Sequence, residues 1–289
     1  MLLSEIDFKK NIINTIKYAR ISNSLTQTDL SNVIGCSRFK IARIESGKSS
    51  ISVEQLDTFM NFFHLSYDNL KLGIVDSKVS NDFENFEINK LHQRDAYTKG
   101  RSLYLYRQHF ISLFGEDEFH QVCKDEKVDP LYFVNINNPL NINFNLRIIQ
   151  KMRIEGHLNR EEQYSLLSKL SMKLPAHHFK FFEEYRQLDG IEKVTKLIEN
   201  MPFYEDDHKF EILKNDSKNE SISYSFHPRE HVDKSLYFED PFIRGYYCQF
   251  NPNYFSNFSG INTTVQKHSC IFNGNECCSF TIKKERYGA

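Results

Sequence analysis

The sequence predicts a multi-domain protein in which an all-α bundle of five short helices precedes a larger α+β domain. Apolar residues recur at helical spacing from the N-terminus to about residue 70, and residues 101–188 also show helical patterns. Alternating patterns typical of strands appear only after residue 208. A chain of 289 residues, 40% of them apolar, is long enough to build two such cores.

The signals that start and stop helices define the N-terminal bundle. An amphipathic first helix is expected over residues 6–22, and a short fifth helix near residues 66–70. Small polar residues stand where the second, third and fourth helices are expected to begin: Thr26, Ser37 and Ser52. Gly35 and Gly47 are expected to end the second and third helices.

Residues 26–48 have the layout of a helix-turn-helix motif that reads DNA. Two short helices flank a tight turn, and the outer side of the second helix is basic. In such motifs the start of the second helix reaches base edges while neighbouring polar and basic residues meet phosphate. The expected DNA-binding residues are Gln27, Thr28, Ser37, Arg38, Phe39, Lys40, Arg43 and Lys48. Arg38 suits a guanine and Phe39 a thymine methyl group, while the other cations are better placed for phosphate.

Residues 16–70 resemble the Cro/cI-type (XRE) helix-turn-helix family, which has a lambda-repressor-like fold. The matching residues are Arg20, Leu25, Thr26, Gln27, Leu30, Gly35, Ser37, Ile41, Ile44, Glu45, Gly47, Lys48, Leu56, Phe63, Leu65, Ser66 and Leu70. The resemblance implies a homodimer that binds a palindromic operator in double-stranded DNA. Ser31 replaces a typical alanine, and the bulky Phe39 leaves the target sequence undetermined. The alternative is a bundle that no longer binds DNA and serves dimerisation.

Residues 74–94 are polar and weakly periodic, which predicts a linker. The linker would separate a helix-turn-helix domain over residues 1–73 from a second domain over residues 95–289. Helices are expected in the second domain at residues 101–114, 117–124, 143–155, 160–174 and 175–188. Strands are expected at residues 209–213, 221–226, 244–250, 263–270 and 278–283. Helices followed by strands indicate an α+β domain whose antiparallel sheet lies at the C-terminus.

The end of the chain resembles the terminal hairpin of 4-vinyl-reductase-type domains, which are relatives of the haem-NO-binding fold. The resemblance depends on a Gly-Tyr pair at residues 245–246 and on the spacing of Gly260, Cys270, Gly274 and Cys278. Residues 100–130 resemble the opening helices of the same superfamily, so the likeness covers roughly residues 97–284. It implies a sensor domain with a hydrophobic cavity for a small molecule.

The same resemblance raises the question of zinc. Some vinyl-reductase-type sensors hold zinc through cysteines at the Cys270 and Cys278 spacing, an upstream cysteine, and an acidic residue three positions before the first of the pair. Here Lys267 occupies the acidic position, so Cys248 or His268 would have to complete the site. The candidate ligands are Cys248, His268, Cys270 and Cys278. The alternative is that these are reduced cysteines on core strands.

Other classes of protein are less consistent with the sequence. Haem is not expected, because residues 224–229 lack the Tyr-x-Ser-x-Arg spacing of haem-binding relatives. No P-loop, GxGxxG, GxSxG or HExxH occurs, so an enzyme is not expected. No apolar run reaches the roughly 20 residues of a membrane span, and Glu5 and Asp7 interrupt the N-terminus where a signal peptide would be apolar. A net charge of −1 requires any DNA affinity to come from a local basic patch.

We therefore expect a cytoplasmic regulator that binds DNA through its N-terminal domain and senses a small, largely apolar molecule through its C-terminal domain. Its six cysteines are expected to be reduced. Three alternatives are a redox or metal sensor that uses its C-terminal cysteines, a domain that binds a protein or peptide partner, and an enzyme fused to a DNA anchor. The cysteines of the first alternative are Cys248, Cys270, Cys277 and Cys278.

Overall fold

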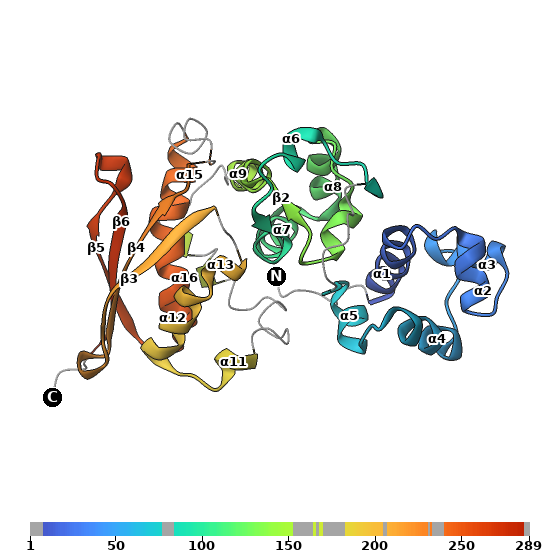
Figure 1. Ribbon diagram of the computed structural model, residues 1–289, viewed down its shortest axis with the longest axis horizontal. Coiled ribbons are helices and arrows are strands. Elements are labelled where there is room, and N and C mark those ends of the chain that lie inside the picture. Colours follow the sequence, from blue (N-terminus) through green and yellow to red (C-terminus); the bar gives the residue numbers. More distant parts are fainter. Residues whose placement is uncertain are drawn as a thin grey trace. The chain divides into compact units, whose positions relative to one another are not determined.

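The computed structural model describes residues 8–76, 84–152, 164–165, 168–169, 183–204, 207–230, 232 and 240–285. The chain divides into two compact units (Figure 1). Unit 1 comprises residues 1–93 and 116–139, and unit 2 comprises residues 94–115 and 140–289. Within the described ranges, no helix combines the length and the apolar character that crossing a membrane requires.

Unit 1 begins with the expected five-helix bundle. Its helices are α1 (Phe8–Ser22), α2 (Gln27–Val33), α3 (Arg38–Glu45), α4 (Val53–Phe63) and α5 (Tyr67–Leu72). The hydroxyl groups that cap α2 to α5 each accept a hydrogen bond from a backbone amide in the first turn, and they belong to Thr26, Ser37, Ser52 and Ser66. Gly35 and Gly47 have φ values of +65° and +73°, which glycine adopts without strain.

One apolar core holds the bundle together. Its buried members are Ile16, Ala19, Leu30, Ile34, Ile41, Ile44, Phe59 and Leu70. Each fully buried Ile, Leu or Phe side chain stabilises the fold by about 1.5–3 kcal/mol relative to exposure. Because Ile41 and Ile44 face this core, the opposite side of α3 is turned to solvent.

The rest of unit 1 differs from the expected linker and domain boundary. Helices α6 (Lys90–Gln93) and α8 (Glu116–Asp125) and the 3-10 helix η2 (Pro130–Val134) belong to the same unit as the bundle. The Tyr18 ring of α1 stacks on Phe86 with 5.5 Å between centroids, and Phe86 also contacts Tyr132. Residues 116–139 therefore pack with the N-terminal bundle, although the sequence assigned them to the second domain. Residues 77–83 of the expected linker lie outside the described residues.

The helices of unit 2 agree in part with expectation. They are α7 (Gly100–Phe114), α9 (Ile142–Lys151), α11 (Glu183–Arg186), α12 (Gly190–Glu199), α13 (Met201–Tyr204), α15 (Pro241–Gly245) and α16 (Asn251–Phe258). The sequence predicted α7, α9 and, within unit 1, α8, but not α12 or α16. Strand β1 (Thr98–Lys99) precedes α7, and β2 (Pro139–Leu140) spans the boundary of the units. Most of the helices expected at residues 160–174 and 175–188 lie outside the described residues, although residues 164–165, 168–169 and 183–186 are helical.

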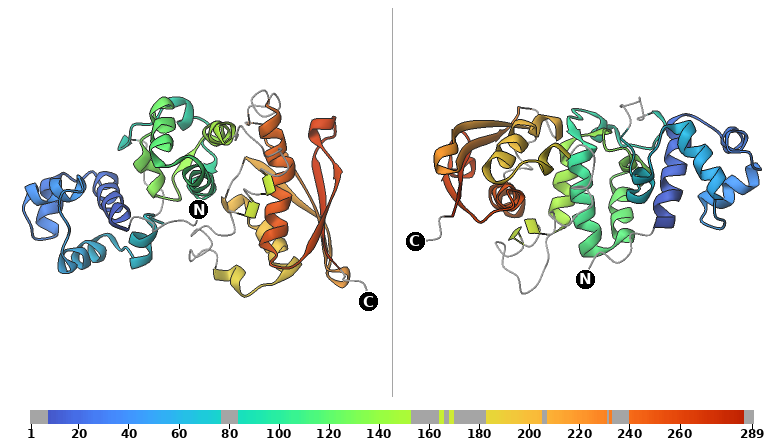
Figure 2. Two further views of the ribbon diagram at one scale, coloured as in Figure 1. Left: turned by 180° about the vertical axis from the view of Figure 1, so that it is seen from behind. Right: turned by 90° about the horizontal axis from the view of Figure 1, so that it is seen from below.

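A four-stranded antiparallel sheet forms the other layer of unit 2, with strand order β3-β4-β6-β5. Its strands are β3 (His208–Asp216), β4 (Ser221–Pro228), β5 (Thr263–Ser269) and β6 (Cys278–Lys284). Figure 2 shows α12 and α16 beside the sheet, and both contact its strands. Tyr224 pairs with Phe280 and Phe226 with Cys278, and all four side chains are buried. The α+β prediction is confirmed.

The strand expected at residues 244–250 is wrong. Those residues are helical, because α15, a π-helical turn η6 (Tyr246–Phe250) and α16 follow one another without a break. Ile243, Tyr247, Phe255 and Phe258 are buried at intervals of three, four and eight residues, which suits a helix packed on a sheet. The π turn ends two residues before Pro252, whose missing amide hydrogen interrupts regular α-helical bonding.

Candidate nucleic-acid interface and cysteine cluster

The solvent side of α3 presents a short row of exposed side chains. Arg38, Phe39 and Arg43 are exposed, and 72% of the Phe39 surface is accessible. The guanidinium carbon of Arg43 lies 6.0 Å from the Phe39 ring centroid, so the two side chains share one face of the helix. The structure therefore places an aromatic ring between cations on the side of α3 that points away from the core.

The other two expected cations flank this row: Lys40 lies in the first turn of α3, and Lys48 lies between α3 and α4. Lys40 Nζ donates a hydrogen bond of 2.8 Å to Gln55 Oε1, which also accepts from the backbone amide of the Ser52 cap. Arg43 donates to the Lys48 carbonyl oxygen at 3.2 Å, and the Lys48 side chain is exposed. Arg38, Lys40, Arg43 and Lys48 together form a local basic patch. A chain with a net charge of −1 would need such a patch to bind DNA.

Two of the expected DNA-binding residues, Ser37 and Gln27, have identifiable local roles. The Ser37 hydroxyl accepts the Lys40 amide and so caps α3, while Thr28 is exposed in the first turn of α2. Gln27 is half-buried, and its Nε2 donates to Glu45 Oε2 at 3.0 Å. Gln27 therefore ties α2 to α3.

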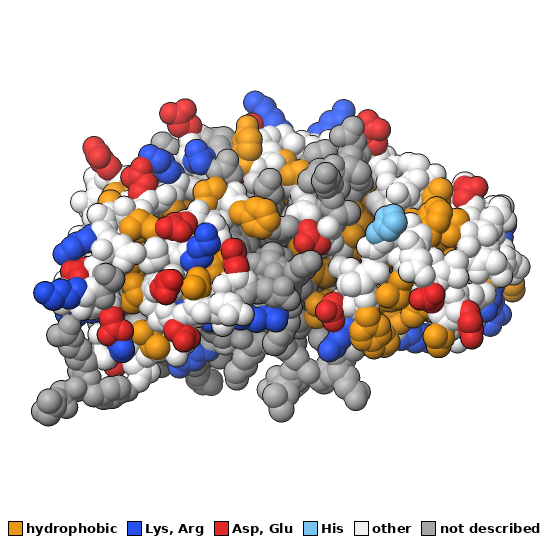
Figure 3. Space-filling model, turned by 60° about the horizontal axis from the view of Figure 1, so that its bottom comes forward, with side chains coloured by type: hydrophobic (Ala, Val, Ile, Leu, Met, Phe, Trp, Pro, Cys, Tyr) orange, Lys and Arg blue, Asp and Glu red, His pale blue; other side chains and the backbone are white. Residues whose placement is uncertain are grey.

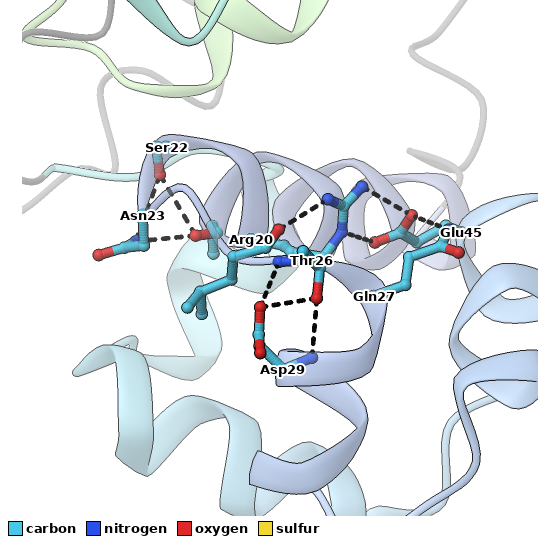
Figure 4. Close-up of polar contacts among 9 residues, drawn as sticks. Arg20, Ser22, Asn23, Thr26, Gln27, Asp29 and Glu45 are labelled. Atoms are coloured by element: carbon cyan, nitrogen blue, oxygen red, sulfur yellow. Dashed lines mark hydrogen bonds and ion pairs between the residues drawn. The ribbon is translucent and has the colours of Figure 1, made fainter.

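A largely buried ion pair joins Arg20 of α1 to Glu45 of α3 (Figure 4). The sequence did not predict this contact. Arg20 Nε and Nη2 contact the two Glu45 carboxylate oxygens at 2.5 and 3.0 Å, and Arg20 Nη1 donates to the Leu25 carbonyl oxygen at 3.0 Å. Only 14% of the Arg20 side chain and 6% of the Glu45 side chain are exposed. With Gln27, this pair joins α1, α2 and α3 through one carboxylate. Arg20 and Glu45, which the sequence identified only as matches to the family, therefore connect α3 to α1 and α2.

Aromatic side chains are also exposed on other helices of unit 1, and Figure 3 shows hydrophobic groups at the surface of the molecule in orange. Phe8, Phe62 and Tyr67 are 38%, 52% and 58% exposed, which is unusual for aromatic rings. The Phe8 and Tyr67 rings lie 5.7 Å apart, and Phe62 contacts Phe63 at 4.9 Å. Exposed apolar surface of this kind is typical of protein contact sites.

Unit 2 contains a cluster of three buried thiols, contributed by three different segments. Cys248 lies in η6, Cys270 directly follows β5, and Cys278 begins β6. The Cys248 Sγ is 3.6 Å from the Cys270 Sγ and 3.7 Å from the Cys278 Sγ, and all three sulfur atoms lie within 4.8 Å of one another. The Ile271 amide donates to the Cys278 sulfur at 3.4 Å.

Hydrogen bonds and a nearby lysine favour the thiolate form of Cys278. The hydrogen bond with Cys248 lowers the pKa of Cys278 below its ordinary value, despite the opposing effect of burial. The same hydrogen bond, followed by burial, raises the pKa of Cys248. Burial lowers the pKa of Lys267, but its hydrogen bond with Cys270 and the nearby sulfur charges outweigh burial and raise it. A lysine ammonium therefore stands beside the sulfur atoms.

The structure brings together three of the four expected metal ligands and leaves the fourth apart. His268 is exposed and lies at a bulge in β5, where its Nε2 is 2.7 Å from Thr281 Oγ1. Among the described residues, the group of potential ligands contains only Cys248, Cys270 and Cys278. Cys277 is half-buried and is not a member. His268 is therefore not part of this group, and its ring nitrogen contacts a hydroxyl group of the neighbouring strand.

Comparison with protein families supports the assignment of the bundle. Residues 16–70 match the family model described as helix-turn-helix. This part of the chain is a helix-turn-helix domain. A segment of 73 residues is 33% identical to "Antitoxin PezA" from Streptococcus pneumoniae serotype 4 (strain ATCC BAA-334 / TIGR4), and it covers 25% of this chain and 44% of the relative. The chain thus matches less than half the length of this curated relative.

Two solved structures are similar to a larger part of the chain. One is the Fe(II) unliganded H-NOX protein from K. algicida, with a TM-score of 0.45 and 9% identity over 66% of this chain and 98% of that chain. The other is a mutant of the same protein, with a TM-score of 0.45 and 10% identity over 65% of this chain and 97% of that chain.

Proposed function

We propose that the protein is a sequence-specific DNA-binding regulator of transcription that inserts α3 into the major groove. The observation that carries the proposal is the solvent face of α3, where Arg38, Phe39 and Arg43 are exposed while Ile41 and Ile44 anchor the helix. A helix held in this way can reach base edges without unfolding.

Each residue of the interface has a role in this proposal. Arg38 pairs with a guanine through two hydrogen bonds, and Phe39 packs on a thymine methyl group. Lys40, Arg43, Lys48 and the first turn of α2 at Thr28 contact phosphate, which fixes the register of the protein on the duplex. A cytoplasmic homodimer would place two copies of α3 on the half-sites of a palindromic operator.

Unit 2 supplies the signal in this proposal. Binding of a small, largely apolar molecule would favour one dimer geometry and so change the affinity for the operator. The aromatic core between the sheet and its helices supports such a role, since Tyr224, Phe226 and Phe280 are all buried there. The vinyl-reductase resemblance belongs to the same proposal, which includes no enzyme activity.

A second candidate is a regulator that binds a protein partner. The exposed rings of Phe8, Phe62 and Tyr67 favour it, as does the relative named as an antitoxin. Sedimentation of the full chain, alone and with a partner candidate, separates the two possibilities. A homodimer without further binding would favour the first.

Selection of binding sites from random double-stranded DNA tests the main proposal. The full chain should enrich a palindrome, and Arg38→Ala should lose about 1–3 kcal/mol of binding free energy and relax specificity at one position of each half-site. Lys124→Ala is the matched control, because Lys124 is an exposed cation of unit 1 that lies on α8. Equal binding by all three proteins, or failure to enrich any sequence, would contradict the proposal.

A further inference from the structure

Among the described residues, the thiol cluster of unit 2 lacks the fourth ligand of the closed zinc site that the vinyl-reductase resemblance implies. Structural zinc sites have four ligands, and here the described residues supply three sulfur atoms. The position of the acidic ligand is held by Lys267, which has no carboxylate to offer a metal. His268 faces Thr281 instead. The arrangement suits negatively charged sulfur better than a bound cation.

We propose that Cys248, Cys270 and Cys278 form an oxidation site that closes a reversible disulfide between η6 and the β5–β6 hairpin. Cys248 is the common partner, because its sulfur lies 3.6 and 3.7 Å from the other two. A disulfide requires about 2.05 Å between sulfur atoms, so one sulfur must move by about 1.6 Å. Rotation of a cysteine side chain between rotamers moves its sulfur by a distance of this order.

The chemistry requires a two-electron oxidant, for which hydrogen peroxide is the simplest class. The Cys278 thiolate attacks one peroxide oxygen, the O–O bond breaks, and a sulfenic acid and hydroxide are formed. The Cys248 thiol then attacks the Cys278 sulfur, and the S–S bond forms as the sulfenic oxygen leaves as water with the thiol proton. The Ile271 amide donates to the Cys278 sulfur and so stabilises its negative charge before attack.

The third thiol distinguishes this site from a structural disulfide. After Cys248 and Cys278 have joined, Cys270 still lies beside Cys248 and can attack its sulfur. The bond therefore exchanges between two arrangements that both contain Cys248. Exchange within the cluster conserves one disulfide, which an added dithiol can then reduce to return all three thiols.

Peptide mapping of the oxidised full chain tests the proposal directly. Reduced, metal-free protein is treated with hydrogen peroxide, alkylated and digested, and the disulfide-linked peptides are identified by mass. We expect two of the six thiols to be lost and every intramolecular disulfide to contain Cys248. Dithiothreitol should restore all six thiols. Because wild-type protein gives this result, the test does not depend on the folding of a variant.

Substitutions sharpen the test. Cys270→Ser should leave the Cys248–Cys278 disulfide, Cys278→Ser should slow oxidation, and Cys248→Ser should abolish the disulfide. Cys277→Ser is the matched control, since Cys277 adjoins Cys278 but lies outside the cluster. Lys267→Glu should slow oxidation and allow the chain to retain added zinc.

Three results would overturn the proposal. One is a wild-type chain that holds one zinc ion per chain and forms no disulfide until a chelator removes the zinc. The others are disulfides that join Cys36 or Cys277 in place of Cys248, and oxidation of the cluster to sulfinic acid without a disulfide. None of these readouts involves DNA, so the oxidation site can fail while the proposed DNA-binding function stands, and the reverse.

Discussion

The helix-turn-helix bundle and the thiol cluster differ in how they bring their candidate functional side chains together. In the bundle, Arg38, Phe39 and Arg43 lie close together in the sequence and project into solvent from one capped helix. In unit 2, Cys248 and Cys270 are separated by 21 intervening residues and meet only because a helix packs on a hairpin. A surface that must meet a large partner is thus built from local structure, whereas a buried reactive cluster depends on tertiary packing.

The largest expected effect concerns the scaffold behind the exposed surface. Arg20→Ala removes one member of a buried ion pair and leaves Glu45 uncompensated, which should lower the free energy of unfolding of unit 1 by about 3–5 kcal/mol. Lys10→Ala is the control, because the Lys10–Glu116 pair is 40% and 26% exposed. That change should cost less than about 1 kcal/mol. Chemical denaturation followed by circular dichroism measures both, and similar losses would show that α3 is not oriented by the buried pair.

A smaller effect is expected at the edge of the interface. Lys40→Ala should weaken binding to all DNA sequences alike and lower the slope of log affinity against log salt by about 0.9, as expected for one phosphate contact. Fluorescence anisotropy over a range of salt concentrations gives the slope. A change confined to one operator position would instead show that Lys40 reads a base, and the division of roles along α3 would need revision.

The smallest expected effect is a pH dependence within the capping box of α2. Hydrogen bonds from the Thr26 hydroxyl and amide lower the pKa of Asp29 below its ordinary value of 3.8. A depressed pKa means that this stabilisation is present above the ordinary value and is lost as pH falls through the folded value. Asp29→Asn should therefore reduce the acid dependence of bundle stability below pH 3.8, measured by thermal unfolding at several pH values. An unchanged dependence would show that other carboxylates dominate.

The two regions also differed in how far the sequence could define them. Thr26, Ser37 and Ser52 mark helix starts through contacts within four residues, so the bundle could be predicted closely. The place of residues 116–139 could not, because it depends on contacts such as Phe86 with Tyr132 that are distant in sequence. Residues 244–250 were mistaken for a strand because their alternating apolar residues fit either structure. Only packing against the sheet decides that they are helical.

Among the site residues, the sequence identified the exposed positions of α3 and all three clustered cysteines. It could not place Gln27 against Glu45 or turn His268 away from the thiols, since both outcomes depend on partners in other elements. Long polar side chains reach several neighbours, and spacing along the chain does not choose between them.

The π turn at Tyr246–Phe250 acts as a phase shift between α15 and α16. A regular α-helix rotates by about 100° per residue, and a π turn inserts one residue beyond the regular repeat. Ile243 before the turn and Phe255 after it are both buried, although α15 packs against α9 and α16 packs against β5 and β6. Loss of a single residue here would rotate one half of the helix against the other. Cys248 lies inside the turn, so the position of its sulfur beside Cys270 depends on the number of residues in the turn as well as on their identity.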